Sequence, residues 1–155
     1  MTQKIKPCLW FDGNGQEAAE FYVSVFKGRG DSGITHVTPG PKGAALVVGF
    51  RLAGVEFLAL NGGPYFKLNE AVSLSVDCRS QEELDELWEK LSAGGSPVQC
   101  GWLKDRYGLS WQIVPSMVHK LLAGADRGRA QRVMAALMGM TKLDIRTLEA
   151  AANAA

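Results

Sequence analysis

The sequence lacks several features that would point to particular classes of protein. Its three cysteines, Cys8, Cys78 and Cys100, are too few and too irregularly spaced for a disulfide scaffold or a structural zinc site. Neither sign of charge dominates, because 17 basic and 16 acidic residues leave a formal net charge of +1. No run of about 18 apolar residues predicts a membrane span, and no apolar stretch follows Lys4 and Lys6 as it would in a secretory signal. These absences predict a cytoplasmic protein with neither a nucleic-acid nor a membrane partner.

The chain does contain enough apolar sequence for one well-buried core, since 46% of its 155 residues are hydrophobic. We therefore predict a single domain over residues 1–155. The apolar periodicity of the first part predicts one helix among four strands: strands over residues 5–11, 34–37, 44–52 and 55–60, and a helix over 16–27. Gly28 is typical of the residue after a helix end, and Ala53-Gly54 is typical of a tight hairpin turn.

The same pattern then begins again. Residues 72–78 read as a strand, and Ser80 with Glu83 forms a capping box at the start of a helix. Adding 66 to the residue numbers of the first helix aligns its apolar residues with those of the second helix, and aligns Gly28 with Gly94. Adding 54 superimposes residues 54–60 on 108–114. We infer an α+β fold made of two βαβββ units, residues 4–63 and 68–115, followed by a helical extension over 116–155.

The stretch Gln99 to Pro115 combines a turn, a strand and most of the candidate chemistry. Asp105 to Gly108 reads as a tight turn, and residues 109–114 then alternate as a strand with two different faces. Beyond Pro115, Asp126 is a candidate helix cap, and Thr141-Lys142-Leu143-Asp144 is expected to open a further helix. The apolar side of the extension includes Val133, Met134, Leu137 and Met138, so its helices are expected to pack on the body or across a dimer.

Five motifs together carry a family resemblance that covers essentially the whole chain. They are Pro7 to Asp12, Phe57 to Pro64, Phe66-Lys67 with Asn69-Glu70, Gln99 to Pro115, and Lys142 to Asp144. A tandem βαβββ pair with these motifs resembles the vicinal oxygen chelate superfamily, which includes glyoxalase I, bleomycin-resistance proteins and extradiol dioxygenases. Within it, the chain is similar to the PhnB-like branch, also described as 3-demethylubiquinone-9 3-methyltransferase-like. The resemblance implies a cupped mixed sheet that holds a small-molecule ligand in its concavity, and a homodimer.

The resemblance also implies where a metal would be bound in metal-dependent members. Their four ligands come from the first and last strands of each unit, and these positions fall near Pro7, Leu58, Ser73 and Gln112 in this chain. None of the four is His, Asp or Glu, and an amide with a hydroxyl is a poor substitute for the charged or imidazole donors of a divalent ion. His36 and His119 lie elsewhere in the sequence and do not rescue the site. We expect no metal and no cofactor.

Aromatic and amide side chains are the candidates for contact with a ligand. Trp10, Phe57, Trp102 and Trp111 could line a flat, apolar pocket, or they could simply be core residues of strands. Asn61 and Gln112 could orient a ligand or could satisfy turn backbone. Cys100 is the candidate nucleophile, but an inert buried thiol is favoured because the sequence shows no base beside it. Asp105-Arg106 is better explained by a turn followed by an exposed ion pair than by catalysis.

A glycine pattern in the first unit gives one further alternative. Gly13-Asn14-Gly15-Gln16-Glu17-Ala18 matches the G-x-G-x-x-A fingerprint of dinucleotide and S-adenosylmethionine loops. Glu17 would place a negative charge where phosphate should bind, and the strands that follow read as antiparallel hairpins. The fingerprint therefore gives little support to a nucleotide-type cofactor.

Three functions remain open from the sequence. The first is a metal-free protein that binds a small apolar or aromatic molecule. The second is an enzyme, either a methyltransferase acting on a quinone precursor, as the family description suggests, or an isomerase or lyase using Cys100 or a bound water. The third is a metalloenzyme of glyoxalase type.

Overall fold

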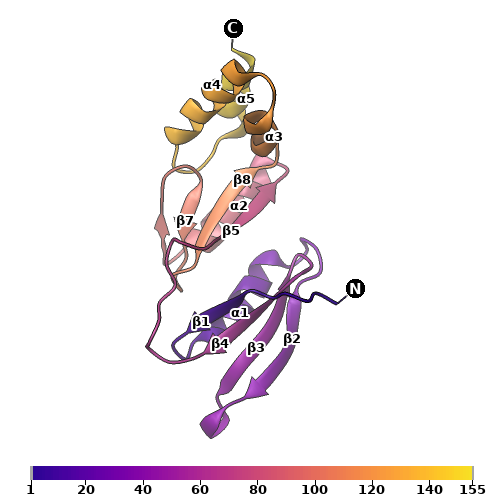
Figure 1. Ribbon diagram of the computed structural model, residues 1–155, viewed down its shortest axis with the longest axis vertical. Coiled ribbons are helices and arrows are strands. Elements are labelled where there is room, and N and C mark those ends of the chain that lie inside the picture. The colour runs from indigo at the N-terminus through magenta and orange to yellow at the C-terminus, as the bar shows by residue number, and fades with distance from the viewer. Residues whose placement is uncertain (1, 155) are drawn as a thin grey trace. The chain divides into compact units, whose positions relative to one another are not determined.

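The computed structural model describes residues 2–154, and the chain divides into two compact units, residues 1–68 and 69–155. Figure 1 labels the elements of each unit. The first contains β1 (Cys8–Phe11), α1 (Gly15–Phe26), β2 (Gly33–Pro39), a 3₁₀ turn (Pro41–Gly43), β3 (Ala45–Leu52) and β4 (Val55–Asn61). The second contains β5 (Ser73–Cys78), α2 (Gln81–Ser92), β6 (Ser96–Pro97), β7 (Trp102–Lys104) and β8 (Ser110–Pro115), followed by α3 (Met117–Ala123), α4 (Arg127–Met138) and α5 (Ile145–Asn153).

The two units have the same topology. The strand order is β1-β4-β3-β2 in the first sheet and β5-β8-β7-β6 in the second. In each unit the first and last strands pair in parallel, β1 with β4 and β5 with β8, and the other pairs are antiparallel. This equivalence confirms the tandem βαβββ repeat and the α+β class that the two sequence offsets predict.

Local signals place the helices where the sequence predicts them. The Ser80 hydroxyl accepts a hydrogen bond from the Glu83 backbone N–H at 3.1 Å, and the Glu83 carboxylate accepts one from the Arg79 N–H at 2.8 Å. The capping box is therefore present, with the carboxylate bonded one residue before the cap. Gly28 and Gly94 follow α1 and α2 with φ of +84° and +76°, a region that glycine occupies without strain.

Each helix covers one face of its own sheet, and a core lies between the two. In the first core, Phe50 and Phe57 stack at a centroid distance of 5.3 Å beneath α1. In the second, Leu103, Trp111 and Ile113 are buried with the apolar stripe of α2. Full burial of one such large side chain stabilises the fold by about 1.5–3 kcal/mol, so these two faces account for much of the stability of each unit.

The linker between α4 and α5 is fastened to the second unit, and we call residues 140–145 the strap. The backbone N–H groups of Cys100 and Gly101 donate to the carbonyl oxygens of Met140 and Thr141, both at 2.8 Å. Leu143 is fully buried and its side chain lies against Gly101, so the strap packs on the second unit.

Gln81 holds the strap from the other side, because its side chain donates to the Leu143 carbonyl at 3.1 Å and accepts from the Ile145 N–H at 2.8 Å. The helix α4 begins at its predicted cap, where Asp126 accepts from the Arg129 N–H at 3.0 Å. The helix expected to open over residues 141–144 begins at Ile145 instead, and Asp144 caps it by accepting from the Thr147 N–H at 2.8 Å.

The predicted apolar stripe of α4 is only partly buried. Val133 is buried, whereas Met134 and Met138 are exposed.

Within residues 2–154, no helix combines the length and the apolar character needed to cross a bilayer.

Candidate functional site

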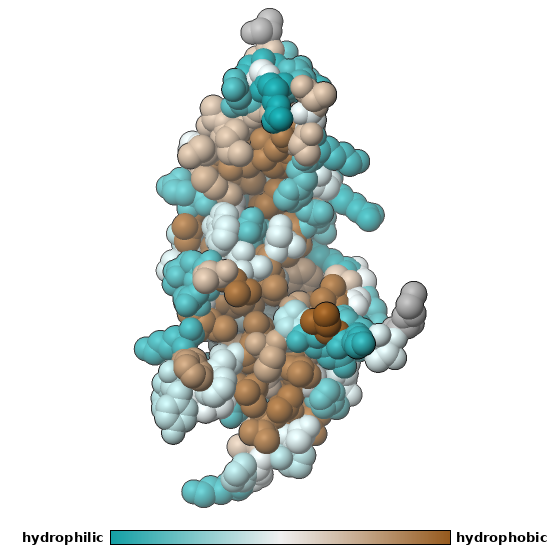
Figure 2. Space-filling view, in the orientation of Figure 1, coloured by the Kyte–Doolittle hydropathy of each residue, from teal (hydrophilic) through white to brown (hydrophobic). Residues whose placement is uncertain are grey.

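The face of the first sheet opposite α1 carries half-exposed apolar side chains, and we call it the first open face. Side chains alternate along a strand, so residues between the buried ones point away from the helix. The apolar members of the face are Cys8, Trp10, Val47, Leu58 and Leu60. Figure 2 shows hydrophobic residues gathered over the strands of this unit. An uncovered apolar sheet face is a candidate binding surface.

Trp10 is fixed at one side of the first open face. Its indole N–H donates to the Gly63 carbonyl at 2.8 Å, and its ring meets that of Phe66 edge-on at a centroid distance of 4.8 Å. A Cβ atom at Gly62 would lie 2.3 Å from the indole ring, so the ring packs directly on the glycine backbone. The structure therefore gives this predicted ligand residue one defined position.

His36 lies on the same face, although the sequence prediction set it aside. The strand register forms a row across the sheet in which Cys8 is opposite Leu58, Leu58 is opposite Gly49 and Gly49 is opposite His36. A Cβ atom at Gly49 would lie 2.2 Å from Cε1 of His36, so the imidazole lies across the bare glycine.

A β-bulge between Ile34 and His36 brings Thr35 to the same place. The Thr35 hydroxyl lies 3.2 Å from Nδ1 of His36 and would lie 2.5 Å from a Cβ at Gly49. A glycine inside a strand often marks such a close approach, so Gly49 is the sequence signal that could have led to His36.

A cluster of charges closes one end of the first open face. Arg51 lies 2.6 Å from Asp31 and 2.8 Å from Glu56, and the other Glu56 oxygen lies 2.9 Å from the Lys6 ammonium. Hydrogen bonds from Arg51, and then from Lys6, hold the pKa of Glu56 below its usual range. The carboxylate is therefore charged and paired at neutral pH, and it marks the polar boundary of the apolar patch.

The equivalent face of the second sheet, which we call the second open face, is mainly polar. Its members are Ser73, Ser75, Trp102, Lys104, Ser110 and Gln112. The Gln112 amide donates to the Ser73 hydroxyl at 2.9 Å, and Lys104 forms an ion pair with Glu70. Ser110 is 1% exposed, and its hydroxyl has no hydrogen-bond partner among residues 2–154. An unpaired buried hydroxyl costs about 1–3 kcal/mol, so Ser110 is a candidate for bonding a ligand.

The strand register shows which residues lie opposite two of the four positions where the family resemblance implies metal ligands. Leu58 is opposite Cys8, one place after Pro7, and Gln112 is opposite Ser75, two places after Ser73. None of these residues has a carboxylate or an imidazole. Within the part of the chain that the structure describes, no group of three or more His, Cys, Asp or Glu residues is arranged to hold a metal ion.

Three predicted ligand residues lie inside their own units instead. Phe57 is 6% exposed in the first core, and Trp111 is 1% exposed in the second. Asn61 accepts from the Gly15 N–H at 2.8 Å and donates to the Ala45 carbonyl at 2.9 Å, so it joins the start of α1 to the sheet. Of the ligand residues predicted from the sequence, Trp10 lies on the first open face, and Trp102 and Gln112 lie on the second.

Asp105 departs from its prediction. The turn is present, since the Gly108 N–H donates to the Asp105 carbonyl at 3.1 Å. The carboxylate, however, is buried, and the expectation of an exposed ion pair is wrong in that respect. It accepts from the backbone N–H groups of Tyr107 at 2.8 Å and Leu109 at 3.1 Å, and from the Trp111 indole at 2.8 Å. The side chain therefore organises the turn from within.

Cys100 lies in the loop before β7, where its backbone, with φ of +64°, donates to the strap. Its side chain is half-buried, so the predicted full burial of the thiol is not found. The glycine fingerprint at residues 13–18 has a structural explanation as well, because the Gly15 N–H at the start of α1 is bonded to Asn61. A Cβ at Gly15 would lie 2.7 Å from that amide oxygen, so this glycine makes room for Asn61.

Comparisons with known proteins agree with this fold. The family described as 3-demethylubiquinone-9 3-methyltransferase matches residues 3–114. A PhnB protein from Bacillus cereus, which carries the same methyltransferase name, is 32% identical with a TM-score of 0.65, over 71% of this chain and 97% of that chain. A protein from Pseudomonas aeruginosa is 22% identical with a TM-score of 0.58, over 71% of this chain and 95% of that chain.

A more distant likeness extends to a resistance protein. The fosfomycin resistance protein FosX from Listeria monocytogenes, whose structure contains Mn(II) and sulfate, is 17% identical with a TM-score of 0.52, over 72% of this chain and 89% of that chain. At that identity the likeness concerns the fold alone. No curated protein matches the chain.

Proposed function

Because the chain belongs to the 3-demethylubiquinone-9 3-methyltransferase family, the PhnB-like branch of the vicinal oxygen chelate superfamily, we propose that it binds a small apolar or aromatic molecule without a metal. The sequence predicts that the ligand is held in a cup, and we propose that the first open face supplies its apolar contacts. The observation that carries this proposal is the apolar patch of the first open face, which α1 leaves uncovered.

The patch is suited to a flat ligand because part of it is rigid before binding. Trp10 is held by its bond to Gly63 and by Phe66, so little side-chain entropy is lost when a ligand stacks on it. Covering apolar area contributes about 25 cal/mol per Å². An aromatic or quinone-like molecule therefore gains most of its affinity on this face.

Each face also carries polar groups that can orient a ligand. On the second open face Gln112, Ser73 and Ser110 offer amide and hydroxyl groups. On the first, His36 offers an imidazole in the row that contains Leu58. Such groups match a ligand with a few hydrogen-bonding oxygens. A divalent ion would instead require several charged or imidazole donors to offset its dehydration.

Equilibrium titration with a panel of naphthols, quinones and other aromatic compounds tests the proposal, with tryptophan fluorescence as the signal. Leu58→Asn is expected to weaken binding about tenfold, because it places an amide in the middle of the apolar patch. Val55→Asn is the matched control, since Val55 is exposed on the same strand but points to the other face. Chelator treatment is expected to leave affinity unchanged. No saturable binding across the panel, or equal losses in the two variants, would refute the proposal.

A methyltransferase is the second candidate, because the family description and the Bacillus cereus protein both carry that name. The start of α1 weighs against the S-adenosylmethionine loop, since the Gly15 N–H is already bonded to Asn61. Calorimetry with S-adenosylmethionine decides this point, and saturable binding would favour the enzyme.

Other enzymatic alternatives have their own tests. Turnover that disappears in Cys100→Ala or Gln112→Ala, while the fold persists, would indicate an isomerase or lyase. Metal analysis of the purified protein would identify a glyoxalase-type metalloenzyme.

We also propose that the chain is a cytoplasmic homodimer. Three free cysteines suit a reducing compartment, and the exposed Met134 and Met138 suit an interface with a second copy. Light scattering during size-exclusion chromatography measures the molar mass, and a monomer at all concentrations would contradict the dimer.

A further inference from the structure

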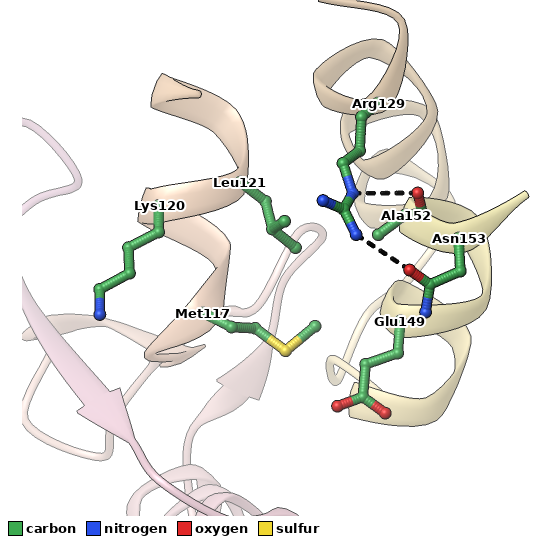
Figure 3. Close-up of a pocket in the computed structure, with 7 residues that line it drawn as sticks. All are labelled: Met117, Lys120, Leu121, Arg129, Glu149, Ala152 and Asn153. Atoms are coloured by element: carbon green, nitrogen blue, oxygen red, sulfur yellow. Dashed lines mark hydrogen bonds between the residues drawn. The ribbon is translucent and has the colours of Figure 1, made fainter. Parts of the chain in front are cut away.

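The helical extension contains a cavity of its own. It has a volume of about 290 Å³ and is lined by Met117, Lys120, Leu121, Arg129, Glu149, Ala152 and Asn153 from α3, α4 and α5 (Figure 3). This volume is at the lower end of the range for small-molecule pockets. The family match ends at residue 114, so the cavity belongs to a part of the chain that the family match does not include.

One part of the cavity wall is apolar. Met117 and Leu121 are one turn apart on α3, and Figure 3 shows both side chains directed across the gap towards α5. Ala152, on the α5 side, is buried and adds a small apolar surface. This part of the wall suits an aliphatic or thioether group of a few carbon atoms.

Arg129 provides a fixed cation at the cavity. Its Nε donates to the Ala152 carbonyl at 3.1 Å and its Nη2 to the Asn153 side chain at 2.9 Å, at the C-terminal end of α5. Nη1 donates to no group within residues 2–154, and in Figure 3 the guanidinium points into the space between α3 and α5. The geometry leaves one edge of a positioned guanidinium available to a carboxylate.

One unpaired carboxylate lines the cavity on the α5 side. Glu149 projects from α5 and forms no ion pair or side-chain hydrogen bond with any residue in 2–154. Lys120 also lines the cavity, but Figure 3 shows its side chain extending from α3 away from the gap. The cavity therefore presents one fixed cation, one carboxylate and an apolar wall.

We propose that this cavity binds a free α-amino acid with an apolar side chain, such as leucine or methionine. The ligand carboxylate pairs with Arg129, its ammonium pairs with Glu149, and its side chain contacts Met117 and Leu121. A plain carboxylate would leave Glu149 as a repulsive neighbour, and a plain amine would leave Arg129 as one, so the zwitterion is the class that matches both charges. This site is independent of the ligand proposed for the open faces.

Calorimetric titration of the full chain with L-leucine, N-acetyl-L-leucine and L-leucinamide tests the assignment. Leucine is expected to bind saturably, and each blocked analogue at least about tenfold more weakly, because each loses one charge pair. Glu149→Gln is expected to weaken leucine binding about tenfold and to strengthen N-acetyl-L-leucine binding, because it removes the carboxylate that repels this analogue. Glu82→Gln is the matched control, because Glu82 is an exposed carboxylate on α2, outside the cavity.

Several outcomes of the titration would overturn the assignment of an amino-acid site. If leucine, methionine and phenylalanine all fail to bind at about 10 mM, or if Glu149→Gln and Arg129→Gln bind leucine as well as the unmodified chain does, the assignment is overturned. Equal affinity for N-acetyl-L-leucine and leucine would show a simple anion site and would also overturn it. A change in molar mass in Glu149→Gln would assign the cavity to an interface between copies. Circular dichroism of each variant verifies that the fold is retained.

Discussion

Replacing Asp105 is expected to destabilise the second unit more than replacing any exposed carboxylate does. The carboxylate is 3% exposed and accepts from two backbone N–H groups through Oδ1 and from the Trp111 indole through Oδ2. Hydrogen bonds to a charged group are worth about 1.5–3 kcal/mol each, and they are not additive. Asp105→Ala leaves three donors without this acceptor, one of them on a side chain that is 1% exposed, so we expect a loss of about 3–5 kcal/mol.

Asp105→Asn gives a sharper test, because an amide keeps one oxygen acceptor. That oxygen can continue to serve the N–H groups of Tyr107 and Leu109, but the new NH₂ group then faces the indole N–H of Trp111. We expect a loss of about 2 kcal/mol in the free energy of unfolding. Asp77→Asn is the control, since the Asp77 side chain is 63% exposed and lies 3.4 Å from the His119 imidazole, and its replacement should cost less than about 0.5 kcal/mol.

Urea denaturation followed by far-ultraviolet circular dichroism measures these differences. The variants can be compared directly if the slope of the free energy of unfolding against urea concentration is the same in each. In a Trp111→Phe background the indole donor is gone, so Asp105→Asn should then cost at least about 1 kcal/mol less. If Asp105→Asn costs no more than Asp77→Asn, or if its cost is the same in the Trp111→Phe background, the assignment of Asp105 as a buried organiser of the turn is refuted.

Three further predictions follow from close contacts and from one ion pair. Gly95→Ala is expected to cost about 3 kcal/mol or more, because the new Cβ would lie 2.0 Å from the Lys104 carbonyl oxygen, whereas Gly33→Ala, with no atom within 4 Å, should cost less than about 1 kcal/mol; urea denaturation compares them. Gly62→Ala should displace the Trp10 ring, which lies 2.3 Å from the added atom, and so change the tryptophan emission and cost about 1–3 kcal/mol. Hydrogen bonds from Lys142, and then from Gln81, hold the pKa of Asp85 below its ordinary value of 3.8. Because the folded pKa is the lower one, this stabilisation is present above pH 3.8 and is lost as the pH falls through the folded pKa, so the stability difference between the unmodified chain and Lys142→Met should shrink below pH 3.8.

Much of the fold could be predicted from the sequence because its signals are local and occur twice. Helix ends depend on a few neighbouring residues, as they do at the Ser80 capping box, at the glycines after α1 and α2, and at the Asp126 and Asp144 caps. The two constant differences in residue number, 66 and 54, then align the helix and last strand of one unit with those of the other. The shared order of the two sheets follows from that duplication.

The candidate site could be predicted only in part, because it depends on which face of each strand the helix covers. Trp111 and Gln112 are adjacent in one strand and so point to opposite faces, and both cannot contact the same ligand. The structure assigns Trp111 to the face beneath α2 and Gln112 to the open face. His36 was missed because a bulge and the bare backbone of Gly49 bring it into the row, and neither is visible in apolar periodicity.

The hydrogen bonds between the strap and the loop before β7 have a consequence for truncation of the chain. The backbone N–H groups of Cys100 and Gly101 donate to carbonyl oxygens of residues that follow the family match, and Leu143 fills the space beside Gly101. Removing residues 140–154 would leave these two N–H groups without their acceptors, next to the strand that carries Trp102. A truncated chain that ends with the family match would therefore lose order in the loop before β7 as well as the three helices.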